Sequence, residues 1–242
     1  MIYSPFMTNL KKYLPTDRAK LRTWLLITGC LLTKLNIVCF QVGIGFIVIG
    51  SMLHLWSKGQ LHQNRELTIT GTYRWVRNPF YVANFFIDLG LCLIINQPIL
   101  TLIYFCFWIY AYMDAILREE KALKSIFGTD YLEYRVKVPR LIPWKPPLKI
   151  VTSNKGFSWR NYNIVAGSEV PRLLRFVSYP LLLFLTAEFR KQGINYIAVP
   201  SHIFALAAYL FVLSLAYLLN RFLKKRKKSF PILDRTQQMG SP

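Results

Sequence analysis

Histidine and cysteine are scarce in this sequence, and neither is arranged as a metal or redox site. The 242 residues hold three histidines without ligand spacing and four cysteines without a CxxC pair or pairing pattern. A zinc or iron site is therefore not expected, and neither disulfides nor a thiolate site are supported. His54 and His202, near the ends of apolar runs, are most simply interfacial or helix-packing residues.

Acidic residues are also few, 11 against 31 lysines and arginines, which gives a net charge of +20. Such a balance can indicate nucleic-acid binding. Here, however, the cations lie in the gaps between apolar runs, where membrane topology and anionic lipid explain them better. Nucleic acid is not expected as a partner, and the lipid bilayer is.

Long apolar runs dominate the composition, which is 53% hydrophobic with a mean hydropathy of +0.29. Several runs are near the length that crosses the hydrocarbon core of a bilayer. We expect an all-α, polytopic membrane helix bundle with about six transmembrane helices, in residues 21–33, 37–56, 80–95, 98–117, 171–189 and 196–220. The first run could instead be a signal sequence, but its cleavage would remove the first crossing.

The positive charges predict the orientation of these helices. With six spans, 28 of the 31 lysines and arginines lie on the side of the N-terminus. Only Lys34, Arg190 and Lys191 lie on the other face. Because positive loops remain in the cytosol, we expect a multi-pass protein with both termini cytosolic.

A polar stretch between two apolar runs, LTITGTYRWVRNPFY at residues 67–81, is the first candidate for chemistry. It combines a glycine turn, two arginines, two tyrosines and an Asn-Pro pair at the start of a helix. Arginine and tyrosine also gather at the membrane surface for purely physical reasons. A simple interfacial anchor is therefore the alternative.

A second stretch follows the tight helical hairpin at Asn96 and Gln97 and lies on the same side of the membrane. It supplies Glu119 and Glu120, and then Tyr131 and Tyr134. Carboxylates and aromatic faces together suit a water-soluble ligand with a cationic part. The alternative is a solvated helix face in which Glu120 pairs with Lys124, four residues on.

Other residues in the apolar runs indicate packing or function. Gly43, Gly45 and Gly50 predict close approach of a neighbouring helix. Asp88 lies in apolar context, where an acid is a functional candidate or a hydrogen-bonded packing residue. For Asp114, close to the water boundary, the packing interpretation is favoured. Gly128 fits a helix C-terminal cap.

The two stretches resemble the isoprenylcysteine carboxyl methyltransferase and phospholipid methyltransferase superfamily. In that family LxTxGxYxxxRHPxY precedes a tight helical hairpin, and an EE pair, FG, YxxY and VPxxxP follow it. Here the corresponding segments are LTITGTYRWVRNPFY, REEKALKSIFG and DYLEYRVKVPRLIP. The match covers residues 43–144, and the chain beyond it matches no part of that core.

The resemblance implies a cytosolic cofactor pocket for S-adenosyl-L-methionine and a lipid-soluble methyl acceptor that arrives from the bilayer. Methyl transfer needs mainly alignment, and no covalent enzyme intermediate or catalytic residue is identified. Carried over position by position, the cofactor-binding residues are Leu67, Tyr73, Asn78, Pro79, Tyr81 and Glu119, while Glu120 and Tyr134 belong to the same motif.

Four positions depart from the family pattern. Asn78 stands where the motif usually has histidine; an amide keeps hydrogen-bonding capacity but cannot titrate near neutral pH. Arg65 likewise replaces a histidine, and Ile69 replaces a threonine. Ala115 occupies the position of a substrate-contacting arginine in the prenylcysteine enzymes, and Arg118 points off that face. A prenylcysteine carboxylate is therefore a doubtful substrate.

The expected organisation is a methyltransferase-like membrane core at residues 1–145, a cytosolic loop at 146–170, an additional transmembrane hairpin at 171–228 and a tail at 229–242. The leading hypothesis is a methyltransferase acting on a small amphiphile, a prenylcysteine-like carboxylate or a phospholipid head group. The alternatives are a membrane NADPH-dependent, sterol-reductase-like enzyme and a non-catalytic scaffold or transporter. A homo-oligomer is possible, and the sequence does not identify the methylated atom.

Overall fold

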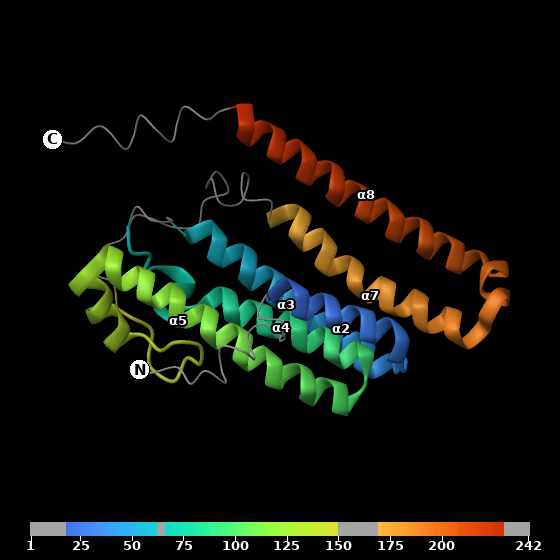
Figure 1. Cartoon of the computed structure of the whole chain (residues 1–242), viewed down its shortest axis with the longest axis horizontal. Helices are drawn as coiled ribbons and strands as arrows, with labels where there is room; N and C mark the ends of the chain where they lie inside the picture. Colours follow the sequence, from blue (N-terminus) through green and yellow to red (C-terminus); the bar gives the residue numbers. More distant parts are fainter. Residues whose placement is uncertain (1–17, 62–65, 150–168, 230–242) are drawn as a thin grey trace, which may run out of the picture.

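The computed structural model describes residues 18–61, 66–149 and 169–229, and this part of the chain is helical (Figure 1). The all-α prediction is confirmed. Residues 150–168 of the loop predicted at 146–170, and residues 230–242 of the predicted tail, lie outside the described residues. The elements are α2 Arg18–Leu32, α3 Ile37–Gln60, the 3-10 helix η1 Gly71–Arg74, α4 Pro79–Ile95, α5 Pro98–Lys137, α7 Glu169–Gln192, the 3-10 helix η2 Gly193–Ala198 and α8 Pro200–Ser229.

Three of these helices are long and apolar enough to cross a membrane, namely Ile37–Gln60, Pro98–Lys137 and Pro200–Phe222. α4 is apolar but shorter, with 17 residues. Large apolar side chains point outward on these helices, as Ile99 and Phe204 do with 76% of their surface exposed. Surfaces of this kind face lipid. The chain is an integral membrane protein built from six described helices.

α3 and α4 pack closely because glycine backbones meet between them. A Cβ atom on Gly43 would lie 2.6 Å from the Gly90 carbonyl oxygen, and one on Gly50 would lie 2.7 Å from the Ala83 carbonyl oxygen. Two of the three glycines predicted to allow close approach therefore do so. The prediction was wrong for Gly45. It points away from α4, and a Cβ atom built on it would have no neighbouring atom within 4 Å.

The turn between α4 and α5 is as short as predicted. Asn96 adopts a left-handed conformation with φ 54°, and its N–H donates to the Cys92 carbonyl. Asparagine tolerates this conformation better than most residues, and Pro98 opens α5 where no intrahelical N–H is needed. The Asn96 and Gln97 amides also donate to the Lys34 and Leu32 carbonyls, which ties the hairpin to α2.

Gly128 interrupts α5, as its sequence context predicted, but the chain then continues as helix. Its φ is 51° and its ψ is −121°. Such a conformation favours glycine, which has no Cβ atom. The residues after the kink, up to Lys137, are helical and carry Tyr131 and Tyr134 back toward η1. The kink thus brings the second polar stretch over the first.

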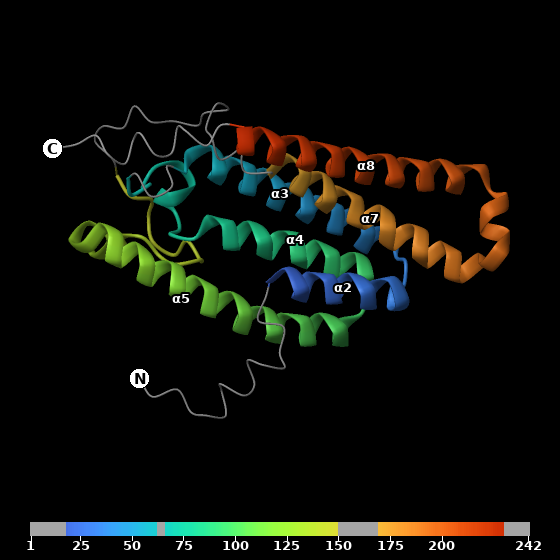
Figure 2. The same ribbon diagram turned by 45° about the horizontal axis from the view of Figure 1, so that its top comes forward.

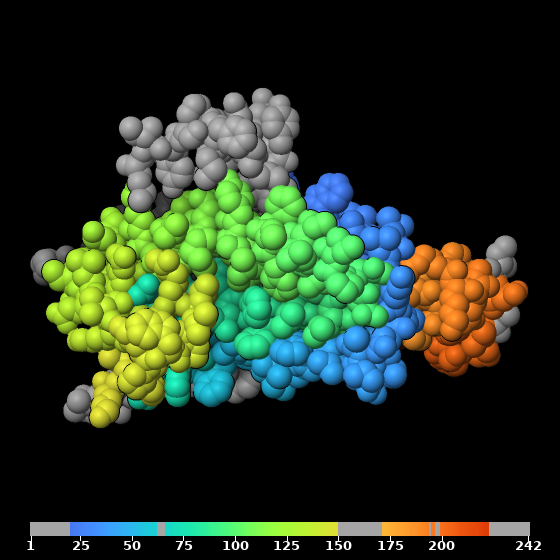
Figure 3. Space-filling view, turned by 90° about the horizontal axis from the view of Figure 1, so that it is seen from below, coloured from blue at the N-terminus to red at the C-terminus, as the bar shows by residue number. Residues whose placement is uncertain are grey.

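The C-terminal residues form a second hairpin, α7 and α8, joined by η2. α8 lies outermost and packs on α7, away from α4 and α5 (Figures 1 and 2). Seen from below, the segment up to Lys149 covers one end of α5, and the turn that joins α7 to α8 projects at the opposite end (Figure 3). The hairpin is therefore an addition to the side of the four-helix core.

Candidate functional site

The glycine turn of the first stretch is fixed by the end of α3. Gly71 has φ +57°, and a Cβ atom on it would overlap the side chain of Gln60. The Gln60 Oε1 accepts from the Thr72 N–H at 2.9 Å and from the Thr72 hydroxyl at 3.1 Å. This clamp holds η1 and aims Tyr73 into the space between α3, α4 and α5.

Glu120 joins the two polar stretches through a buried cluster. Its Oε1 accepts from the Arg77 Nη2 at 3.2 Å and from the Asn78 Nδ2 at 3.1 Å, and its Oε2 accepts from the Arg140 Nη2 at 2.9 Å. The alternative of a solvated Glu120 paired with Lys124 was wrong, because this side chain is buried. Hydrogen bonding to Glu120 raises the pKa of Arg140 above its ordinary value, so the guanidinium stays charged.

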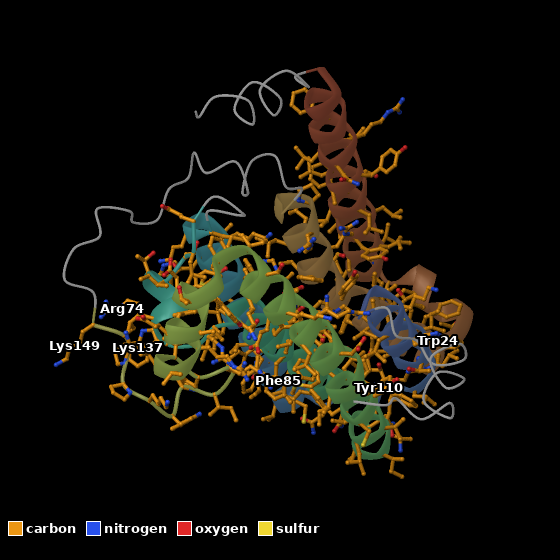
Figure 4. All side chains as sticks on the ribbon, turned by 60° about the vertical axis from the view of Figure 1, so that its left-hand side comes forward. Trp24, Arg74, Phe85, Tyr110, Lys137 and Lys149 are labelled. Atoms are coloured by element: carbon orange, nitrogen blue, oxygen red, sulfur yellow. The ribbon has the colours of Figure 1, made fainter. Side chains whose placement is uncertain are left out.

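Backbone contacts strengthen the same junction. The Arg77 N–H donates to the Pro139 carbonyl at 2.8 Å, and the Asn78 N–H donates to the Arg140 carbonyl at 3.2 Å. Arg74 and Leu148 exchange two hydrogen bonds, from Leu148 N–H to Arg74 O and from Arg74 Nε to Leu148 O. Figure 4 shows Arg74, Lys137 and Lys149 gathered at this end of the molecule.

Glu119 lies one residue before Glu120 on α5 and has a different environment. A step of about 100° along the helix turns its carboxylate toward α4. There it accepts from the Tyr81 hydroxyl at 2.6 Å, and its side chain is exposed at the edge of a cavity. Glu120 thus joins the two polar stretches, whereas Glu119 faces the cavity.

The cavity has a volume of about 360 Å³ and lies where both stretches meet. Tyr73 contributes a hydroxyl that is buried and has no hydrogen-bond partner among the described residues. Burial raises the pKa of Tyr73 well above its ordinary value of 10, so this hydroxyl stays protonated and can donate. A buried orphan hydroxyl in a cavity is a group that a ligand can satisfy.

Seven of the eight predicted cofactor-binding residues line this cavity: Leu67, Tyr73, Asn78, Pro79, Tyr81, Glu119 and Tyr134. Glu120 does not line it. The carboxylate oxygens of Glu120 are occupied by Arg77, Asn78 and Arg140, so it positions the wall instead.

Sequence reasoning missed several wall residues. Phe80 lines the cavity and lies under the Lys58 ammonium group at 4.8 Å from its ring centre, and neither residue was predicted to belong to the site. Gln60 and Arg140 act through Thr72 and Glu120. Arg140 falls within the VPRLIP run, so its motif position was a signal, whereas nothing in the sequence pairs Gln60 with the distant turn.

Asp88 belongs to a separate polar cluster. It is fully buried, and it forms an ion pair with Arg22 at 2.6 Å. Its other oxygen accepts from the Trp108 Nε1 at 3.0 Å and the Tyr112 hydroxyl at 3.3 Å. Of its two sequence interpretations, the hydrogen-bonded packing residue is confirmed; the cluster connects α2, α4 and α5.

Two further sequence interpretations can be compared with the structure. Asp114 pairs with Arg118, four residues on, at 3.1 Å, which confirms the packing interpretation. Ala115 is buried in α5. Arg65 and His62 lie outside the described residues. Among the residues that are described, no three His, Cys, Asp or Glu side chains are grouped to hold a metal ion.

Comparison with known proteins finds similarity over this same region. A family model described as "Phospholipid methyltransferase" matches residues 24–130. The Homo sapiens protein-S-isoprenylcysteine O-methyltransferase is 29% identical over 129 residues, 53% of this chain and 44% of that protein. The Saccharomyces cerevisiae protein of the same name is 32% identical over 119 residues, 49% of this chain and 48% of that protein.

The chain thus spans slightly less than half the length of these curated relatives. No solved structure matches it. The similarities do not favour the reductase or the scaffold alternative.

Proposed function

Since the core of this chain, residues 24–130, belongs to the isoprenylcysteine and phospholipid methyltransferase superfamily, we propose that the protein is a membrane methyltransferase that uses S-adenosyl-L-methionine. One observation carries the proposal. Tyr81 and Glu119 come from the two motif stretches and meet at 2.6 Å on the rim of a single cavity. This contact supports the proposal because it brings both stretches of the superfamily motif to one cavity.

The lining residues fit such a donor. A carboxylate at Glu119 can accept from the ammonium group of the amino acid part. The rings of Phe80 and Tyr81 offer apolar faces for the adenine and favour a positive centre nearby. The Tyr73 hydroxyl supplies a buried donor, and the cavity volume of about 360 Å³ lies within the range of small-molecule sites.

Asn78 contributes an acceptor to this pocket. Its amide nitrogen donates to the Glu120 carboxylate at 3.1 Å and to the Arg140 carbonyl at 3.4 Å. Both partners are acceptors, so the amide orientation is fixed. The carbonyl oxygen of Asn78 is left for the ligand. Because an amide does not titrate, we expect donor binding to lack the pH dependence that a histidine would give it.

The chemistry requires little of the chain itself. The sulfonium group of the bound donor supplies an activated methyl group. The residues of the site hold the donor, align it with the acceptor and exclude water. Glu120, Arg77 and Arg140 keep the wall rigid, and Asn78, Tyr81 and Glu119 give the ligand a defined orientation.

The proposed acceptor is a lipid-soluble amphiphile that enters from the bilayer. At the position where the resembling prenylcysteine enzymes have an arginine, the side chain is the buried Ala115. The nearby Arg77 and Arg140 are already paired with Glu120. A phospholipid head group or another small amphiphile therefore fits better than a prenylcysteine carboxylate. We place the pocket and both termini in the cytosol from the charge distribution.

Calorimetry on the full-length protein with S-adenosylhomocysteine tests this proposal. We expect saturable binding by the wild type. The affinity of Glu119→Ala should be at least roughly tenfold lower, since a charge-assisted hydrogen bond is lost. The matched control is Glu133→Ala, an exposed acid on the same helix whose partner is Lys137. Absence of binding by the wild type, equal binding by Glu119→Ala, or saturable binding of NADPH in its place contradicts the proposal.

A further inference from the structure

A second cavity lies at the other end of the bundle, in a region that the superfamily match covers only at α2. Its volume is about 490 Å³, and α2, α7, η2 and α8 all contribute to it. Leucines such as Leu182, Leu185 and Leu206 form much of its wall, and Arg190, Tyr196 and His202 contribute polar groups.

Three polar residues of this cavity, Arg190, Tyr196 and His202, gather where α7 ends and α8 begins. The Tyr196 ring stacks on His202 at 4.1 Å and meets the edge of Phe189 at 5.9 Å, so its position is fixed. Only 6% of Tyr196 is exposed, and its hydroxyl has no hydrogen-bond partner among the described residues. Burial raises the pKa of Tyr196, so the hydroxyl remains a donor near neutral pH.

Arg190 adds a positive charge beside this hydroxyl. Its Nη2 donates to the Thr33 carbonyl at 2.6 Å, and it forms no ion pair within the described part of the chain. Lys34 and Lys191 lie at the same end. The acid there is Glu188, whose carboxylate accepts from the Gln192 amide at 2.7 Å. The net charge of this end therefore favours an anion.

The rest of the cavity is mainly apolar, although Thr186 and Tyr209 also line it, and it extends toward the middle of the bundle. Leu182 precedes Arg190 by eight residues, about 12 Å along a helix at 1.5 Å per residue. On the antiparallel α8, Leu206 lies one turn deeper than His202. A ligand that fills this space has a polar end at Arg190 and Tyr196 and an apolar part about 12 Å long.

We propose that this cavity binds an amphiphile with an anionic head group, a phosphate or a carboxylate, and a hydrocarbon tail drawn from the bilayer. The head group would accept from the Tyr196 hydroxyl and the Arg190 guanidinium. The tail would lie among Leu182, Leu185 and Leu206. Such a lipid would join the C-terminal hairpin to α2.

This ligand is not the methyl acceptor. The Lys34 N–H donates to the Ile95 carbonyl, so this end of α2 lies beside the last residue of α4. Pro79, which lines the first cavity, is the first residue of that helix. At the rise of an α-helix, the two ends of α4 are roughly 24 Å apart. Lipid binding in this cavity therefore does not depend on whether the first cavity binds a methyl donor.

Photolabelling of the full-length protein in phosphatidylcholine nanodiscs provides the test. The probe is phosphatidylglycerol with a diazirine in the acyl chain, and mass spectrometry locates the labelled peptides. We expect saturable labelling of residues 182–189 and 203–209. Arg190→Gln should lower the apparent affinity about tenfold and Tyr196→Phe about fivefold, in line with a charged and a neutral hydrogen bond.

Matched controls separate the site from ordinary boundary lipid. Lys191→Gln removes a neighbouring cation outside the cavity, and Tyr217→Phe removes a hydroxyl from an exposed ring on α8; both should label like the wild type. Leu206→Trp should fill the cavity and reduce labelling without touching the polar end.

Competition identifies the head group. Displacement of the probe by unlabelled phosphatidylglycerol assigns a phosphate, and displacement by a free fatty acid alone assigns a carboxylate; both support the proposal. Labelling that does not saturate against the phosphatidylcholine background overturns it. So does equal labelling of Tyr196→Phe, Arg190→Gln and wild type, or labelling confined to the outer face of α8.

Discussion

The two cavities at opposite ends of this bundle are built in different ways. The first is held by polar contacts between residues far apart in the sequence, such as Glu120 with Arg77, and Gln60 with Thr72. The second is shaped mainly by apolar side chains of neighbouring helices, with three polar groups at one end. The core thus depends on specific pairing, whereas the added hairpin depends on shape and on the lipid phase around it.

The largest expected effect comes from removing the carboxylate at the centre of the first cavity's wall. Glu120→Ala leaves Arg77, Asn78 and Arg140 without their shared acceptor, and loss of one partner of a buried pair costs about 3 kcal/mol or more. We expect the free energy of unfolding, measured by SDS titration in mixed micelles, to fall by that amount and S-adenosylhomocysteine binding to be lost.

Glu120→Gln is the matched control, because it keeps hydrogen-bonding capacity and removes the charge. It should lose less stability than Glu120→Ala. Lipid labelling at the second cavity should survive in both variants, since Tyr196 and Arg190 have no contact with this cluster. Equal stability of Glu120→Ala and the wild type would contradict the central role of the cluster.

A smaller effect is expected at the glycine turn. Gly71→Ala places a Cβ atom in a left-handed residue, against the Gln60 side chain, and we expect a loss of about 2 kcal/mol together with weaker donor binding. Gly45→Ala is the control, because no atom lies within 4 Å of its Cβ position in a helix. It should be neutral or slightly stabilising. Thermal unfolding of both variants in one detergent measures the difference.

The buried hydroxyl of Tyr73 should make the free energy of unfolding decrease at high pH. Its pKa is raised in the folded state, so its contribution to stability is complete below about pH 10 and is lost as the pH rises toward the folded-state value. In that range one tyrosine lowers the free energy of unfolding by about 1.4 kcal/mol per pH unit. Tyr73→Phe should make this slope less steep by the contribution of one tyrosine, in SDS titrations carried out between about pH 10 and about pH 11. An unchanged slope would show that this hydroxyl is not buried.

The smallest effect is expected for the exposed pair on α5. Asp114→Asn breaks the contact with Arg118, whose side chain is 65% exposed. Exposed pairs of this kind contribute less than about 0.5 kcal/mol. Both donor binding and lipid labelling should match the wild type, and a change in either would show that Asp114 does more than pair with its neighbour.

The architecture was largely predictable from the sequence. Apolar runs, proline and glycine positions indicated the helices, the tight turn at Asn96 and the break at Gly128, because these features follow from local backbone preferences. The motif named eight residues for the site, and seven of them line the cavity. Local rules were sufficient wherever the outcome depended on residues near in the chain.

The remaining features depend on contacts between distant segments. Nothing near Glu120 in the sequence shows that Arg77 and Arg140 converge on it, and the i, i+4 rule favoured Lys124 instead. The pairing of Asp88 with Arg22 has the same origin, as does the clamp of Gln60 on the glycine turn. The prediction for Gly45, which was expected to contact a neighbouring helix, was also wrong. Helical periodicity does not identify which face of a helix has a close neighbour.

The reciprocal hydrogen bonds between Arg74 and Leu148 fasten the end of the core segment to its own first polar stretch. The polar end of the core is therefore closed without the chain beyond Lys149. The apolar middle is different, because Phe176 and Leu183 of α7 are buried in the same hydrophobic cluster as Leu25 and Ile95. Loss of the hairpin would expose that cluster and leave the polar closure in place.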